Sequence, residues 1–286
     1  MADIKPFARY AAIDWSGARG KRHRGIAVAI CGRGGKAPRL VRPGHIWSRG
    51  EVRDWLLDAA IEAPTLFGFD FSFAPPIAGR GAYLPGEEAV PAAAKPFWAY
   101  VDARCGDEDL GAASFLERHH RRHFYFGAAD GRKADFLHHR VCERAFNAIG
   151  GGKASTVYDA IGAAQVAKAS FAGMRLLNRI AGDIPIWPFD PPVAGKSLVV
   201  EIYTRLFLRL AGRSGRKIRT REELDRALAA FGSEPAALAA HPSDHHSDAL
   251  IAAAGLRAIA GDPACWRPAG LTPRLAATEG WTFGIA

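Results

Sequence analysis

The sequence predicts an α/β protein in which helices pack on a mixed β-sheet. Residues 9–46 consist of short strand-like runs joined by glycine-rich links, which is typical of an antiparallel meander. Strand-like and helix-like segments alternate further along the chain, and this alternation indicates further strands in the same sheet. With 286 residues, 49% of them hydrophobic, the chain is long enough for one large domain or two small ones.

The predicted strands are short apolar runs bounded by turn residues. Basic or glycine-rich links separate the first three, and Pro75 and Pro76 stop the fourth. In chain order the strands are 9–14, 25–31, 38–46, 65–73 and 196–207. Glycine, proline, alanine and charged residues mix over 75–135, and we predict an insertion or cap there, within a single domain spanning 1–286.

Three predicted helices begin at a side chain that can cap the first turn. The capping residues are Ser48, Thr220 and Ser243, and in the first two helices a glutamate three residues later completes a capping box. These helices are expected over 49–63, 220–232 and 243–261. Helical patterns without a cap signal cover 109–123, 136–149 and 160–182.

The composition favours a polyanionic partner. The formal net charge is +9, and basic clusters lie at 19–25, 118–123 and 213–221, each with a solvated surface as the alternative interpretation. The four cysteines form no C-x-x-C pair, so their spacing indicates neither a zinc site nor a disulfide framework. We find no apolar run of membrane-spanning length and no signal peptide, and we expect a cytoplasmic protein without a membrane partner.

Three predicted strands carry a carboxylate among apolar residues. Asp14 ends the run YAAID, Asp70 lies among phenylalanines in LFGFDFSF, and Glu201 follows valines in SLVVEIY. A buried carboxylate needs a partner, because its desolvation costs several kcal/mol. A salt bridge to an arginine is the simple alternative for each one. If the three strands are neighbours, their carboxylates can converge on one point.

The helix predicted over 243–261 adds polar groups in its first turns. Asp244 and Asp248 are four residues apart, and His245 and Asp248 are three apart, so each pair shares a helical face. Acids at this position also interact favourably with the helix dipole, and a purely surface role for both aspartates is the alternative. The apolar remainder of the helix indicates that it packs on the core and begins near the strand ends.

Several carboxylates in one pocket would repel one another and protonate unless a cation joined them. Oxygen ligands with at most one histidine suit Mg²⁺ or Mn²⁺, and two such ions about 3.5 to 4 Å apart catalyse phosphodiester hydrolysis. We therefore expect two divalent ions, with His245 assisting proton transfer. The expected ligands and catalytic acids are Asp14, Asp70, Asp244, Asp248 and Glu201, of which Glu201 could instead orient water.

An aspartate on the first strand, an acid on the fourth, and an Asp/His and Asp pair opening a late helix resemble the RNase H-like superfamily. Most of residues 9–284 is similar to a family of predicted RNase H-like nucleases, domain of unknown function 429, with 75–135 matched poorly. Thr204 stands where this family usually has a proline. The matching motifs are IDWSG (13–17), R-x-x-E (Arg140, Glu143), Gln165 and Val166 with Gly173, IWPFD (186–190), VVEIY (199–203), SDALIAA (247–253) and EGWTFG (279–284).

The resemblance implies a five-stranded mixed sheet of order 3-2-1-4-5 with flanking helices. It also implies a metal-dependent nuclease with nucleic acid as its partner. We expect Ser16, Arg140 and Lys153 to contact the substrate, with Arg140 and Lys153 reaching toward a phosphate over the acidic centre. A helix-surface ion pair between Arg140 and Glu143 is the alternative.

Two other functions fit parts of the sequence. The motif DWSG (14–17) also resembles the phosphate-binding turn of actin-like ATPases, which transfer phosphate, although 286 residues leave little room for the duplicated fold of those proteins. A non-catalytic RNase H-like module that binds nucleic acid or protein is the other alternative. The sequence does not distinguish DNA from RNA, endonucleolytic from exonucleolytic cleavage, or one oligomeric state from another.

Overall fold

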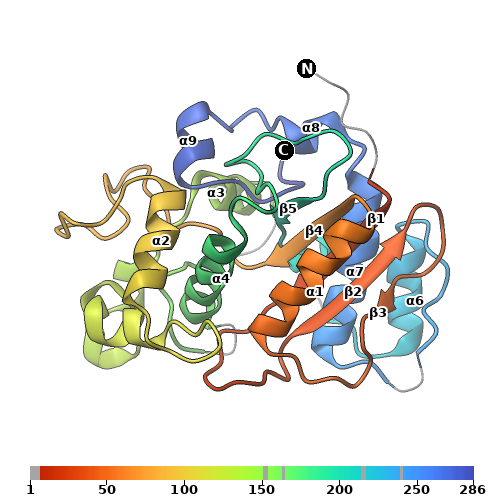
Figure 1. The fold of residues 1–286 in the computed structure, drawn as a ribbon, viewed down its shortest axis with the longest axis horizontal. Coiled ribbons are helices and arrows are strands. Elements are labelled where there is room, and N and C mark those ends of the chain that lie inside the picture. Colours follow the sequence, from red (N-terminus) through yellow and green to blue (C-terminus); the bar gives the residue numbers. More distant parts are fainter. Residues whose placement is uncertain (1–6, 151–153, 163–164, 214–216, 239–240) are drawn as a thin grey trace.

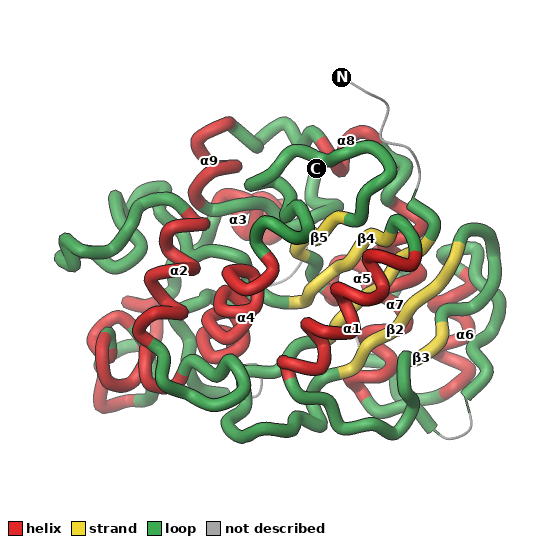
Figure 2. Tube along the Cα trace, viewed as in Figure 1, coloured by secondary structure: helices red, strands yellow, loops and turns green. Residues whose placement is uncertain are grey.

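The computed structural model describes residues 7–150, 154–162, 165–213, 217–238 and 241–286, and these fold around a five-stranded sheet of order β3-β2-β1-β4-β5 (Figure 1, Figure 2). The strands are β1 (Arg9–Asp14), β2 (Ala27–Gly32), β3 (Arg39–Leu40), β4 (Thr65–Asp70) and β5 (Leu198–Glu201). Strand β1 pairs antiparallel with β2 and parallel with β4, and β4 pairs parallel with β5. The predicted α/β class and the sheet order are confirmed.

Helices cover both faces of the sheet (Figure 1). One face packs against α1 (Arg49–Glu62) and α4 (Val166–Ile180), and the other packs against α7 (Asp244–Ile259). Because side chains alternate across a strand, odd-numbered residues of β1 and β4, such as Ile13 and Phe69, enter the first core, and even-numbered ones face α7. This parity decides which side of the sheet each candidate site residue faces.

The other helical segments lie around these layers. Helices α5 and α6 contact α7, and α2 contacts α4. In Figure 1 the segment 75–135 lies on the side of α4 that is away from the sheet. None of the described helices is both long and apolar enough to cross a membrane. Their bounds are α2 (Ala94–Arg104), α3 (Val141–Ala148), α5 (Thr204–Leu210), α6 (Arg221–Ala229), α8 (Pro263–Trp266), α9 (Pro273–Thr278) and the short turns η1 (Phe115–His119), η2 (Arg121–His123), η3 (Ala128–Asp130) and η4 (Lys133–Phe136).

Local signals locate the helix starts better than the strand ends. All three predicted caps are present, and α1, α6 and α7 begin within one residue of the predicted positions. The strand predicted over 196–207 ends at Glu201, because α5 begins at Thr204. The region 109–123 contains the short turns η1 and η2 in place of one long helix, and α2 is a helix that the sequence pattern does not predict.

Two glycines allow close contacts near the carboxyl ends of the central strands. A Cβ atom at Gly17 would lie 2.2 Å from the backbone nitrogen of Ala169, so the loop after β1 touches α4 directly. A Cβ atom at Gly68 in β4 would lie 2.7 Å from Ile202 and 3.2 Å from Leu256 of α7. Both positions exclude a side chain, which explains the glycine of the IDWSG motif in packing terms.

Candidate metal centre at the ends of the central strands

Asp14 and Asp70 lie side by side at the carboxyl ends of β1 and β4. The two strands are parallel neighbours, and Asp14 is the register partner of Asp70. Register partners on neighbouring strands point to the same face of a sheet, with the strands about 4.8 Å apart. Both residues belong to the even-numbered set that faces α7. The register therefore brings together two of the three strand carboxylates that the sequence predicts to converge.

Helix α7 brings two more titratable groups to this point. Ser243 caps the helix by accepting a hydrogen bond from the backbone N–H of His246. In the first turn, Nδ1 of His245 lies 2.6 Å from Oδ2 of Asp14. Asp248 follows one turn later, and it lines the same pocket as the two strand aspartates.

The three carboxylates oppose one another's ionisation. Burial, followed by the charge of Asp14, raises the pKa of Asp70 to about 7. The same two causes raise the pKa of Asp248 to about 7. Burial also raises the pKa of Asp14, although its hydrogen bond with His245 acts against the rise. A divalent cation at this point would stabilise all three charged forms together.

The carboxylate cluster (Asp14, Asp70 and Asp248) lines a pocket of about 540 Å³, a volume within the range of ligand sites. Thr204 and Lys217 also line it. The Thr204 hydroxyl donates a hydrogen bond of 2.6 Å to Oδ2 of Asp70, a bond that a proline at this position could not make. The sequence marks Thr204 only as a departure from that proline, and Lys217 only as part of the basic cluster 213–221.

Glu201, a predicted ligand, does not join the carboxylate cluster. Its register partner on β4 is Phe69, so its side chain points to the face opposite Asp70. Four hydrogen bonds reach its two oxygens, and they fill the acceptor positions of a carboxylate. The donors are the Phe73 N–H, the Thr282 hydroxyl and two nitrogens of Arg140. We therefore leave Glu201 out of the candidate metal ligands.

Arg140 uses all five of its side-chain N–H groups within the protein. Its Nε donates to Glu143 at 2.9 Å, so the ion pair considered as the alternative does form, but both residues are buried and the pair lies inside the protein, not on the surface. The two terminal nitrogens donate to Glu201, the Glu279 carbonyl and the Ser72 hydroxyl. Although Arg140 lines the pocket, it has no donor left for a phosphate. Lys153 lies outside the described residues.

Asp244 faces solvent beside the pocket. Its carboxylate contacts Nζ of Lys217 at 2.6 Å and Arg219 at 3.8 Å. The Lys217 bond lowers the pKa of Asp244, which is the behaviour of an ionised, paired surface acid. The alternative of a purely surface role therefore describes Asp244 better than a ligand role.

Ser16, a predicted substrate contact, does line the pocket. Its hydroxyl accepts a hydrogen bond from the backbone N–H of Ala18.

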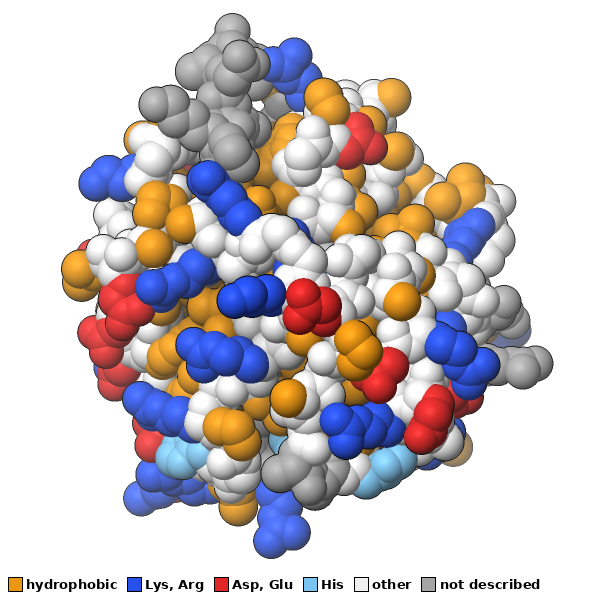
Figure 3. Space-filling model, turned by 90° about the vertical axis from the view of Figure 1, so that its right-hand side faces the viewer, with side chains coloured by type: hydrophobic (Ala, Val, Ile, Leu, Met, Phe, Trp, Pro, Cys, Tyr) orange, Lys and Arg blue, Asp and Glu red, His pale blue; other side chains and the backbone are white. Residues whose placement is uncertain are grey.

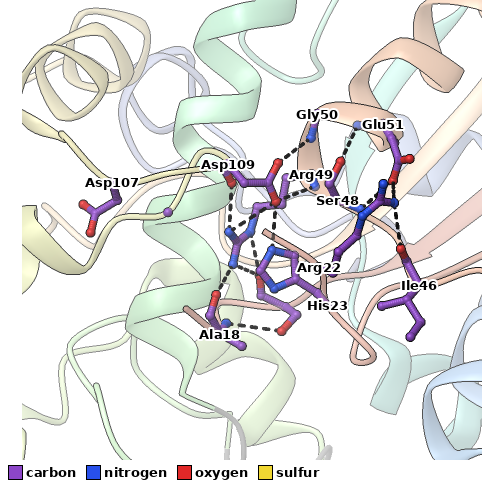
Figure 4. A network of polar contacts seen from close by, with 12 residues as sticks. Ala18, Arg22, His23, Ile46, Ser48, Arg49, Gly50, Glu51, Asp107 and Asp109 are labelled. Carbon is purple, nitrogen blue, oxygen red and sulfur yellow. Dashed lines mark hydrogen bonds and ion pairs between the residues drawn. The ribbon is translucent and has the colours of Figure 1, made fainter. Parts of the chain in front are cut away.

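A buried network holds the loop that follows β1 (Figure 4). The guanidinium of Arg49, at the start of α1, donates hydrogen bonds to the carbonyl oxygens of Ser16 and Ala18. It also donates to the carbonyl of Asp109, whose carboxylate accepts a hydrogen bond from the Arg49 backbone N–H. Arg49 thus holds Ser16 and Ala18, which line the pocket, in position. No sequence motif distinguishes Arg49 from the chain's other arginines.

The candidate ligands that remain are Asp14, Asp70 and Asp248. In the described structure they do not bring three ligand oxygens within 4.8 Å of one another. Elsewhere among the described residues, Glu87, His120 and His123 do bring three ligand atoms within 4.8 Å of one another.

Comparison with known proteins adds no assignment to this geometry. No protein-family model, curated protein or solved structure matches the chain. The resemblance to RNase H-like nucleases therefore stays a prediction, of which the structure confirms the sheet order. Fold and site define an α/β protein with a carboxylate cluster at the ends of its central parallel strands.

Proposed function

We propose that this protein is a metal-dependent phosphodiesterase that cleaves nucleic acid, with Mg²⁺ or Mn²⁺ held by Asp14, Asp70 and Asp248. The observation that carries the proposal is that these half-buried carboxylates line one pocket. Burial, followed by the charge of Asp14, raises the pKa of Asp70 and of Asp248 there to about 7. Carboxylate oxygens gathered in a pocket are the donor set that hard divalent cations prefer. The proposal places the protein with RNase H-like nucleases.

The side chains around the cluster have separable roles. When bound, two divalent ions would activate a water molecule and stabilise the leaving oxygen of the phosphodiester. His245 keeps 48% of its side chain exposed, and its hydrogen bond to Asp14 raises the pKa of the imidazole. A protonated His245 can supply a proton to the leaving group. Thr204 orients the Asp70 carboxylate through its hydroxyl group.

A polyanionic substrate is supported by charge. The chain carries a net charge of +9, and many Lys and Arg side chains lie on the face at the β3 and α6 side of the molecule (Figure 3). Basic side chains bind backbone phosphates of any sequence, with strong dependence on salt. Lys217 brings one ammonium group to the pocket itself. We therefore favour nucleic acid over a small phosphate ester.

Cleavage of labelled DNA and RNA at low ionic strength tests the proposal. We expect cleavage with Mg²⁺ or Mn²⁺ and none with a chelator. The variants Asp14→Asn and Asp70→Asn should lower the rate by about 100-fold or more, because each removes a charged ligand. Asp54→Asn is the matched control, since this aspartate is an exposed surface acid on α1, and it should cleave like the wild type.

Three results would contradict the proposal. Cleavage at the wild-type rate by Asp14→Asn would show that the carboxylate cluster is not the catalytic centre. Metal-dependent binding of nucleic acid without cleavage of any substrate would support the non-catalytic module instead. A thermal shift that depends on a nucleoside triphosphate, in a protein that cleaves nothing, would favour the phosphotransferase.

A further inference from the structure

The segment 75–135 holds a group of potential metal ligands that the proposed function does not use. Oε1 of Glu87 lies 3.1 Å from Nε2 of His123 and 3.8 Å from Nδ1 of His120, and each of the three residues places one ligand atom within 4.8 Å of those of the other two. Glu87 comes from the chain before α2, whereas the histidines come from the turns that follow it. Both histidines belong to the basic cluster 118–123, which composition alone interprets as a contact for polyanions or as solvated surface.

His120 turns into the protein and has an unused nitrogen on the side of Glu87. The residue is 5% exposed, and its Nδ1 atom has no hydrogen-bond partner. The other ring nitrogen, Nε2, lies 3.2 Å from the Tyr100 hydroxyl, and the Phe115 ring packs against the imidazole. A hydrogen bond donated by Nε2 to Tyr100 leaves the lone pair on Nδ1, where Glu87 and His123 meet it.

We propose that Glu87, His120 and His123 bind one Zn²⁺ ion. Two imidazole nitrogens and one carboxylate oxygen form a donor set that Zn²⁺ takes in proteins, with a fourth position left for water. Mg²⁺ fits this set poorly, because it prefers oxygen ligands. Tetrahedral ligands about 2.0 to 2.1 Å from Zn²⁺ lie about 3.3 Å from one another, close to the two distances from Glu87. Tyr100 is the kind of hydrogen-bond partner that orients a metal-binding histidine.

The surrounding charges permit a cation at this site. Arg122 contacts the same Glu87 oxygen at 2.9 Å, but 64% of its side chain is exposed. An exposed ion pair is weak, so the guanidinium can move into solvent when the metal binds. Burial lowers the pKa of His120 to about 4 and also lowers the pKa of His123, which favours the neutral, metal-binding form of both imidazoles.

Zinc at this site would join two parts of the chain that α2 separates. Glu87 and His123 are 36 residues apart, and the segment between them includes α2, which contacts α4. The ion would therefore hold the segment 75–135 in shape beside the sheet. This structural role is independent of the carboxylate cluster, because the two sites share no residue.

Titration of the chelator-treated full chain with ZnCl₂, followed by calorimetry, tests the zinc site. We expect one equivalent to bind to the wild type and to the Asp14→Asn/Asp70→Asn variant. Affinity should fall by about 100-fold or more in His120→Ala and in His123→Gln. His119→Ala is the matched control, because His119 is the exposed neighbour in the same cluster, and it should bind like the wild type.

Wild-type affinity in His120→Ala, or no binding of ZnCl₂ to the wild type, would overturn the zinc site. Loss of zinc from the Asp14→Asn/Asp70→Asn variant alone would overturn it as well, by assigning the ion to the carboxylate cluster. X-ray absorption at the zinc edge of the wild type needs no variant and therefore avoids misfolding. It should show two imidazoles at about 2.0 to 2.1 Å, and coordination by oxygen alone would contradict the proposal.

Discussion

At the scale of single residues, the carboxylate cluster is only partly compensated by the protein. The hydrogen bond with His245 and the charge of Lys217 both lower the pKa of Asp14, against the effect of its burial. Asp70 receives its hydrogen bond from the neutral hydroxyl of Thr204. An added cation would therefore stabilise the charged form of Asp70. This difference makes Asp70 the best residue with which to measure the repulsion in the site.

The raised pKa of Asp70 predicts a pH-dependent stability of the metal-free protein. An aspartate with a pKa of about 7 in the folded protein, against an ordinary value of 3.8, contributes stability that is fully present below its unfolded pKa and is lost as the pH rises through 7. Between pH 5 and pH 8, the unfolding free energy of the wild type should fall by about 2 kcal/mol relative to Asp70→Asn, which lacks this titration. Urea unfolding of both proteins at the two pH values measures the difference.

Because the two proteins differ at one position, titrating groups that lie away from the carboxylate cluster cancel in the comparison, and the measured difference belongs to Asp70 together with its coupling to Asp14 and Asp248. The groups that cancel include Glu51, whose pKa is lowered to about 2, and His120, whose pKa is lowered to about 4. A stability difference that stays constant between the two pH values would mean that Asp70 is ionised throughout, and that the three acids do not interact as described.

At the scale of elements, the register between parallel strands separates two sets of acids. Asp14 and Asp70 are partners on β1 and β4 and face α7. Glu201 on β5 is the partner of Phe69, faces the opposite side, and joins a buried ion pair with Arg140 at the start of α3. Breaking a buried pair leaves an uncompensated charge inside the protein. The first set is thus available to a ligand, and the second holds β5 to α3.

This division predicts opposite effects for two similar substitutions. Glu201→Gln should lower the unfolding free energy by about 3 kcal/mol, because buried Arg140 loses one of its two charged partners and keeps only Glu143, and it should leave the Kd for Mg²⁺ unchanged. Asp70→Asn should weaken Mg²⁺ binding without a comparable loss of stability. Chemical unfolding and calorimetric titration on the same samples separate the two effects. If the Glu201→Gln protein has normal stability but no longer binds Mg²⁺, then Glu201 is a metal ligand and the division is wrong.

The same elements show what the sequence can and cannot predict. Alternation within a strand is local, so the shared face of Gly68 and Asp70 is readable from the sequence. The register between strands is not local, and a shift of one residue moves a side chain to the other face, as happens for Glu201. Helices α1, α6 and α7 have side-chain caps and begin where predicted, whereas α2 has no side-chain cap and nothing local marks its start.

At the scale of the whole molecule, two candidate metal sites lie in different parts of the fold. The carboxylate cluster lies where β1 and β4 meet α7, and the group of Glu87, His120 and His123 lies in the segment 75–135, beyond α4 in Figure 1. The first offers oxygen ligands and the second mainly nitrogen. The sequence predicts the carboxylate cluster, because acids within apolar strands are visible in it. It does not predict the group of Glu87, His120 and His123, because these residues come together only in the tertiary fold.

Anomalous diffraction from crystals soaked in Mn²⁺ shows whether Asp14, Asp70 and Asp248 form one site for divalent cations. We expect one or two anomalous peaks within bonding distance, about 2.0 to 2.3 Å, of oxygens of Asp14 and Asp70, with Asp248 drawn toward them. Crystals of Asp70→Asn should lose these peaks. A fully soaked wild-type crystal with no peak at the carboxylate cluster would contradict the proposed site.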